Sequence, residues 1–149
     1  MGVSKAFTKE DDEIPEQHAG RHRSSSGLPP GAVNYMTAEG ARRLRKELAG
    51  AKGRRAVDLQ HVLDSATVVP EHESAPKEAL FGVSVTIRQA DGTQATYRIV
   101  GVDEIGMAPG WVSWVSPLAR ALIGARVGHR VHLPETPAEE TVQIVKLGH

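Results

Sequence analysis

The chain has 149 residues, 40% of them hydrophobic, which is enough for one modest core and excludes two full-sized domains. Lys and Arg together number 18, as do Asp and Glu, so net charge alone does not direct the chain to nucleic acid or membranes. The absence of cysteine excludes disulfides and thiolate metal sites, and no apolar run approaches the roughly 18 residues of a membrane span, so we expect a cytoplasmic protein.

Residues 1–34 combine charge runs, serines, glycines and prolines with very few apolar side chains. A segment of this composition buries too little surface to offset the entropy lost on ordering. We therefore expect a flexible tail over residues 1–34.

Residues 35–69 contain two short apolar patterns at helical spacing. Thr37 is a suitable N-cap, Glu39 lies in the first turn, and Ala41, Leu44 and Leu48 follow on one helix face. A second apolar set follows the turn: Val57, Leu59, Val62, Leu63 and Ala66. Two short stripes joined by a glycine turn predict an antiparallel helical hairpin.

The tip of this hairpin is basic. Gly50 and Gly53 are expected to end the first helix, because glycine adopts positive φ at low cost. Lys52, Arg54 and Arg55 lie at the tip and form a candidate electrostatic contact site. Such a hairpin can bind RNA, DNA or an acidic protein surface, and the alternative is an ordinary solvated helix face.

A polar linker with two prolines, residues 70–79, separates the hairpin from a region of different periodicity. Val83, Val85 and Ile87 alternate with polar residues, and the sequence ADGT at 90–93 is a tight-turn signal. Further strand patterns occur at 97–100, 111–115, 130–133 and 141–147, with a short helix expected over 117–123. The predicted fold class is α+β: a helical hairpin followed, over residues 80–149, by a small antiparallel β-sheet with one helix.

The most specific stretch is SWVSPLARALIGARVG at 113–128, in which Ser116 caps a helix that Pro117 opens. Together with TYRIVGVDE at 96–104 and the closing TVQIVKLGH, it resembles the C-terminal domain of the bacterial transcript cleavage factors of the GreA/GreB family. SKAFTKEDDE and PPGAVNYMTAEG are similar to GreB beginnings in particular. The resemblance covers most of residues 32–149.

The resemblance implies a C-terminal domain with a fold like the FK506-binding proteins, which docks at the rim of the RNA polymerase secondary channel. The family's Ser-x-x-Ser-Pro-Leu-Ala signature makes Ser113, Val115, Ser116, Pro117 and Leu118 the candidate polymerase-binding residues. It also implies a long coiled coil whose acidic tip helps to hold a catalytic Mg²⁺ in the polymerase, a chemistry that needs oxygen ligands. The presence of Ser116, Pro117 and Leu118 is explained equally well by the need to cap the helix.

The chain departs from the family pattern at the hairpin. Each arm has roughly 12 to 14 residues and reaches only about 20 Å, at about 1.5 Å per residue. The tip offers no carboxylate, and Val115 stands where the family has Asp. We therefore expect a monomeric regulator without catalytic residues, metal or cofactor, which binds the polymerase without stimulating cleavage and meets nucleic acid only through that complex. The short hairpin resembles the regulators of nucleoside diphosphate kinase. True cleavage stimulation, prolyl isomerisation and a basic module unrelated to the polymerase remain the alternatives.

Overall fold

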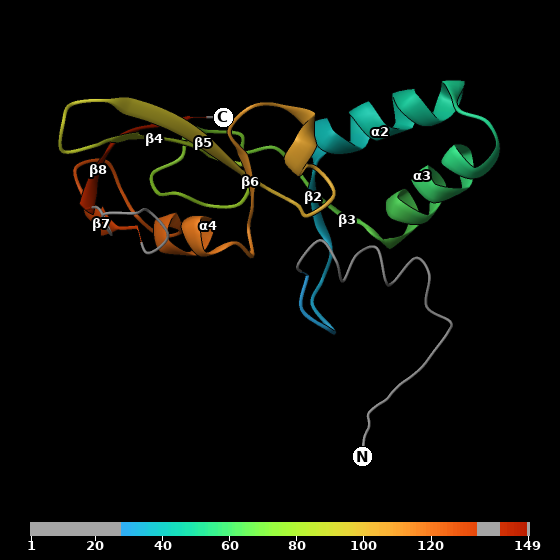
Figure 1. Ribbon diagram of the computed structural model, residues 1–149, viewed down its shortest axis with the longest axis horizontal. Coiled ribbons are helices and arrows are strands. Elements are labelled where there is room, and N and C mark those ends of the chain that lie inside the picture. Colours follow the sequence, from blue (N-terminus) through green and yellow to red (C-terminus); the bar gives the residue numbers. More distant parts are fainter. Residues whose placement is uncertain (1–27, 134–140, 149) are drawn as a thin grey trace, which may run out of the picture.

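The computed structural model describes residues 28–133 and 141–148. A helical hairpin projects from one end of a curled sheet, and a two-stranded pairing lies between them (Figure 1). The α+β prediction is confirmed. Within the described residues, no helix is both long enough and apolar enough to cross a membrane.

The hairpin consists of α2, Ala38–Gly50, and α3, Gly53–Ser65. Thr37 caps α2 as predicted, because its hydroxyl accepts a hydrogen bond from Gly40 N at 3.0 Å. The turn differs from the prediction in one respect. Gly53 has a φ of +61°, but Gly50 is the last residue of α2 and does not adopt positive φ.

The base of the hairpin is a pair of parallel strands that the sequence patterns did not predict. β2, Tyr35–Thr37, pairs with β3, Thr67–Val69, in the register Tyr35 to Thr67. Parallel strands need a long crossover connection, and the hairpin itself supplies it. The β-branched run at 67–69 favours the extended conformation over a further turn of α3.

The hairpin has a thin core. Met36, Ala41, Leu44 and Leu59 are buried, and the outer members of the predicted stripes pack only partly against them. Val57, predicted for the apolar face of α3, is 54% exposed. Two helices provide one layer of contacts, and no third element in the described residues covers the outer face of α3.

The second unit is a five-stranded sheet in the order β6-β5-β4-β8-β7. Its strands are β4, Ser84–Arg88; β5, Gln94–Val100; β6, Trp111–Ser113; β7, Arg130–His132; and β8, Thr141–Gly148. The predicted antiparallel pairing holds from β5 to β7, whereas β6 pairs with β5 in parallel. Residues 101–110, which include the 3₁₀ turn Ile105–Met107, carry the chain back and permit this pairing.

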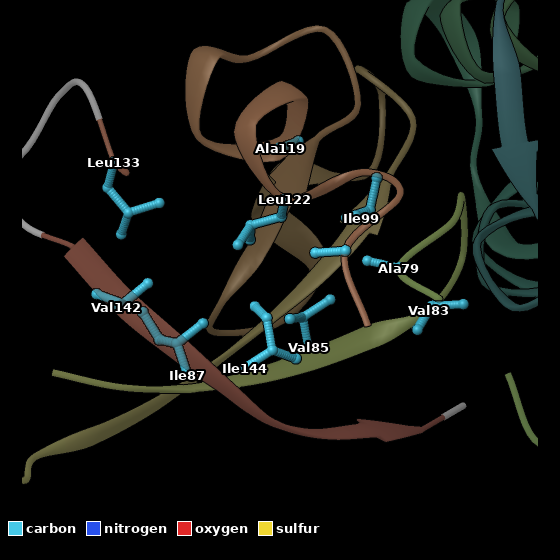
Figure 2. Close-up of a cluster of buried hydrophobic side chains, with 11 residues drawn as sticks. Ala79, Val83, Val85, Ile87, Ile99, Ala119, Leu122, Leu133, Val142 and Ile144 are labelled. Atoms are coloured by element: carbon cyan, nitrogen blue, oxygen red, sulfur yellow. The ribbon is translucent and has the colours of Figure 1, made fainter. Parts of the chain in front are cut away.

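One helix, α4, Pro117–Leu122, covers a face of this sheet. The alternating residues Val85 and Ile87 of β4 are fully buried, and Leu122 of α4 packs over them with Ile144 of β8 (Figure 2). At about 25 cal/mol per Å² of apolar surface, this cluster is the main source of stability for the sheet unit.

The expected tail, residues 1–34, and the expected linker, residues 70–79, each end in a residue that makes defined hydrogen bonds. Residues 1–27 of the expected tail lie outside the described residues, but Asn34, at its end, is only 6% exposed. The Asn34 side-chain amide donates hydrogen bonds to Asp103 at 3.0 Å and to Ser65 at 3.3 Å. In the expected linker, Ala79 is buried and its N–H donates to the Ala125 carbonyl at 2.8 Å.

Candidate functional site

The predicted docking residues form one turn between β6 and α4. The Ser113 carbonyl accepts hydrogen bonds from the Ser116 hydroxyl at 2.7 Å and the Ser116 N–H at 3.0 Å. The Ser116 hydroxyl in turn accepts the Ala119 N–H at 3.2 Å and so caps α4, in which Pro117 is the first residue. The hydrogen bonds of both serines are therefore made within the turn itself.

The remaining two residues of the signature differ in their surroundings. Leu118 packs partly against the core cluster, whereas Val115 lines a hollow of about 600 Å³. We call this the α4 hollow; its lining residues are Pro29, Trp114, Val115, Arg120 and Ile123. The lining of the hollow is apolar with one cation, Arg120, because position 115 carries a valine and not a carboxylate. Of the five predicted residues, only Val115 presents its side chain to this hollow.

Lys52, Arg54 and Arg55, the candidate contact residues of the hairpin tip, are not equivalent charges. Arg55 Nε donates to Glu47 Oε2 at 2.7 Å across the turn, so its charge is already partly balanced. Lys52 is the N-cap residue of α3 and makes no side-chain cap bond. Lys52 and Arg54 are exposed.

The tip does not fit Mg²⁺. Magnesium requires oxygen ligands, and residues 50–55 offer cationic side chains that repel it. In the described ranges, no group of three or more His, Cys, Asp or Glu side chains is placed to hold a metal ion. Residues 50–55 therefore offer no carboxylate to hold a metal ion.

Sequence reasoning missed the residue that joins the hairpin to the sheet unit. Glu104 follows β5 and is fully buried. Its carboxylate accepts the Thr37 N–H at 3.0 Å, the Gly101 N–H at 2.7 Å and a short bond from the Thr37 hydroxyl. Burial raises the pKa of Glu104 above its ordinary 4.5, and the bonds from Thr37 and Gly101 act in the opposite direction.

A glycine marks this contact in the sequence. A Cβ added to Gly40, in the first turn of α2, would lie 1.9 Å from Glu104 Oε1. A glycine inside a helical pattern indicates either a weakened helix or a close approach, and here it is a close approach. That was the available signal, because an acidic residue in a connecting loop otherwise predicts a solvated side chain.

A charged cluster holds the same junction from the solvent side. Arg98 of β5 donates to Glu39 Oε1 at 2.6 Å, and Arg43 of α2 donates to Glu39 Oε2 at 2.7 Å. The hydrogen bond from Arg98 chiefly holds the pKa of Glu39 below its usual range. Both guanidinium groups lie over the ring of Trp111, at 5.0 and 5.1 Å from its centroid. The Arg43 side chain also donates to the Met107 carbonyl at 3.0 Å.

The two tryptophans of the chain contact different parts of the molecule. Trp114 packs against the core cluster and meets Tyr35 edge-on, with ring centroids 5.3 Å apart. Trp111 serves the hairpin junction. Both side chains are partly buried, with Trp111 in β6 and Trp114 directly after it.

The fold and its junction thus describe a two-part factor in which a short helical arm is fixed to a sheet domain. The family model for the transcription elongation factor GreA/GreB C-terminal region matches residues 66–148. A GreB from Neisseria meningitidis serogroup A is 37% identical over 122 residues, which covers 77% of this chain and 75% of the relative. A GreB from Pseudomonas aeruginosa is 39% identical over 120 residues, covering 76% and 71%.

Among solved structures, a GreA/GreB elongation factor from Nitrosomonas europaea aligns with 79% of this chain and 99% of its own, at a TM-score of 0.45 and 21% identity. The matched family model and the identity to the curated relatives establish the assignment. The chain belongs to the GreA/GreB family of transcription elongation factors.

Proposed function

We propose that this protein is a Gre-type regulator that binds bacterial RNA polymerase at the rim of its secondary channel and does not stimulate transcript cleavage. The sheet unit, residues 80–149, is the docking domain, and the hairpin, residues 35–69, is an arm that enters the channel only part of the way. The protein acts as a cytoplasmic monomer and a regulator rather than an enzyme, and meets nucleic acid only through the polymerase complex.

One observation carries this proposal: the length and chemistry of the hairpin. Each helix has 13 residues, which corresponds to about 20 Å at about 1.5 Å per residue. Its tip carries Lys52 and Arg54 where metal delivery needs carboxylates. An arm of this length and charge can occupy the channel entrance and exclude a longer factor, but it brings no ligand for Mg²⁺.

Two assays on the full chain test the proposal. Core polymerase should retain the protein in a pull-down, and a backtracked elongation complex should show no faster cleavage when the protein is added. With a cleavage-competent GreB present, excess protein should slow cleavage by competition. Failure to bind core polymerase overturns the docking proposal, and accelerated cleavage by the protein alone overturns the second part.

A matched pair of variants locates the docking surface. Val115→Arg adds a second cation to the hollow that already contains Arg120, and polymerase retention should fall. Val127→Arg makes the same change at an exposed valine outside the hollow, and retention should not change. Equal losses in both variants would assign docking to another surface.

The alternative, a basic hairpin that binds nucleic acid directly, is less well supported. With Arg55 engaged by Glu47, the tip offers Lys52 and Arg54 as exposed cations without a recorded ion pair among the described residues. Two phosphate contacts from the tip alone give a salt slope of only about 2 on logarithmic axes, and the exposed Arg45 and Lys46 of α2 would raise it to about 4. Tight, salt-dependent DNA binding that is lost on replacing Lys52, Arg54 and Arg55 with Ala would favour this alternative.

A further inference from the structure

The α4 hollow is an apolar surface that no element of the described residues fills. Ile123, directly after α4, is 41% exposed and lines the hollow. The indole ring of Trp114 lines the hollow, with its Nε1 buried. The hollow therefore combines apolar walls with one cation.

The N-terminal segment, residues 1–27, joins the rest of the chain at the wall of this hollow. Pro29 is one of the lining residues, and the 27 residues that precede Leu28 are joined to the chain at this point. Ile14 lies 15 positions before Pro29, a distance of at most about 50 Å along an extended chain. Any residue from Ile14 onward can therefore reach the hollow, at the high effective concentration that a short tether provides.

The sequence of that segment complements the hollow. Residues 10–13 read EDDE, and Ile14, Pro15 and Glu16 follow. Ile14 is a large aliphatic side chain between acidic neighbours, which matches apolar walls beside the guanidinium of Arg120.

We propose that residues 10–16 bind in the α4 hollow of their own chain, with Ile14 against its apolar wall and the acidic side chains beside Arg120. The segment then covers Val115 and competes with whatever partner docks there. Its binding within the chain is independent of the proposed function, whereas its effect on polymerase rests on it.

The hairpin offers poorer sites for the same segment. The basic tip has charge but, in residues 50–55, no large apolar side chain. The depression lined in part by Leu48, Val57, His61 and Asp64 contains a carboxylate that repels an acidic run. Among the described residues, the α4 hollow joins apolar walls to a cation at the point where the segment is tethered.

Tryptophan indole signals test the contact directly. The chain has two tryptophans, so the ¹H–¹⁵N spectrum of the full-length protein has two indole resonances, and Trp111→Phe assigns them. Ile14→Ser should shift the Trp114 resonance and leave that of Trp111 unchanged, because Trp111 does not line the hollow. Val3→Ser, a matched change in the same segment outside the acidic run, should move neither.

The opposite results overturn the proposal. An unchanged Trp114 resonance in Ile14→Ser shows that the segment does not occupy the hollow. Shifts confined to amides around Lys52 and Arg54 place the segment on the hairpin tip instead. Neither result depends on polymerase.

A binding assay tests the consequence. If the segment covers the hollow in about 70–90% of molecules, Ile14→Ser should bind core polymerase about threefold to tenfold more tightly than the unmodified chain, with Val3→Ser unchanged. A Trp114 shift with unchanged polymerase affinity refutes the competition. If neither the unmodified chain nor the variant binds polymerase, the proposed function fails, and the indole spectra still decide whether the segment docks.

Discussion

The buried Glu104 carboxylate makes a sharp prediction about Gly40. A Cβ at this position would lie 1.9 Å from Glu104 Oε1 and 2.6 Å from its carboxyl carbon, so Gly40→Ala must displace the carboxylate or the helix. Displacing the carboxylate breaks its bonds from Thr37 and Gly101 and leaves a buried group without partners.

The magnitude follows from two opposing effects. Depriving a buried charged group of its partners costs about 3–5 kcal/mol. Replacing glycine with alanine in a helix contributes up to about 1 kcal/mol of stability. We therefore expect Gly40→Ala to lower the free energy of unfolding by about 2–4 kcal/mol, which is about 5–15 °C in Tm for a chain of this size.

The assay is urea and thermal unfolding followed by circular dichroism, with Gly50→Ala as the matched control. Gly50 lies in the same helix, and an added Cβ there meets nothing within 4 Å, so this variant should be as stable as the unmodified chain or slightly more stable. If Gly40→Ala unfolds at the same urea concentration as Gly50→Ala, the junction is not held by Glu104 as described.

Three further predictions concern the same regions. Burial raises the pKa of Glu104, so between pH 4.5 and the raised value the folded state binds more protons than the unfolded state. The free energy of unfolding therefore falls as pH rises through that window. Glu104→Gln should remove this decline in unfolding experiments across pH. The pKa of Glu39 is lowered, chiefly by the hydrogen bond from Arg98, so its contribution to folding stability is lost as pH falls below about 4.5. Glu39→Gln should flatten the acid side of the stability profile by less than about 1 kcal/mol, because the pair is partly exposed. Val115→Asp restores the carboxylate of the family pattern and should strengthen retention of the protein by core polymerase, and weaker retention would contradict the docking surface proposed above.

Local signals account for the elements that the sequence predicted correctly. The alternation of Val83, Val85 and Ile87 requires one buried sheet face whatever lies on the other side. Thr37 and Ser116 cap helices through bonds to N–H groups three residues away, so their roles depend on the adjacent chain alone. The composition of the tip, too, needed no structure to be recognised as basic.

Long-range contacts account for what the sequence did not predict. The parallel pairing of β2 with β3 joins residues on either side of the whole hairpin, and no local pattern encodes it. The ion pair of Arg55 with Glu47, which reduces the charge available at the tip, depends on the angle at which two helices meet. The family signature identified the Ser113–Leu118 turn, but only the packing shows that its serines are engaged and that Val115 lines the hollow.

The sequence by itself determined the two helices of the hairpin, the helix α4 and the strands of the five-stranded sheet, together with the short arms of the hairpin and the absence of carboxylates at its tip, because these depend on residue type and spacing. The tertiary structure decided the pairing of β2 with β3 and how the two units are joined. Glu104 lies in a connecting segment of the sequence, and it becomes the buried link between hairpin and sheet only because folding brings Thr37 and Gly40 against it. A carboxylate can be buried where three donors converge, and their convergence is a property of the folded chain.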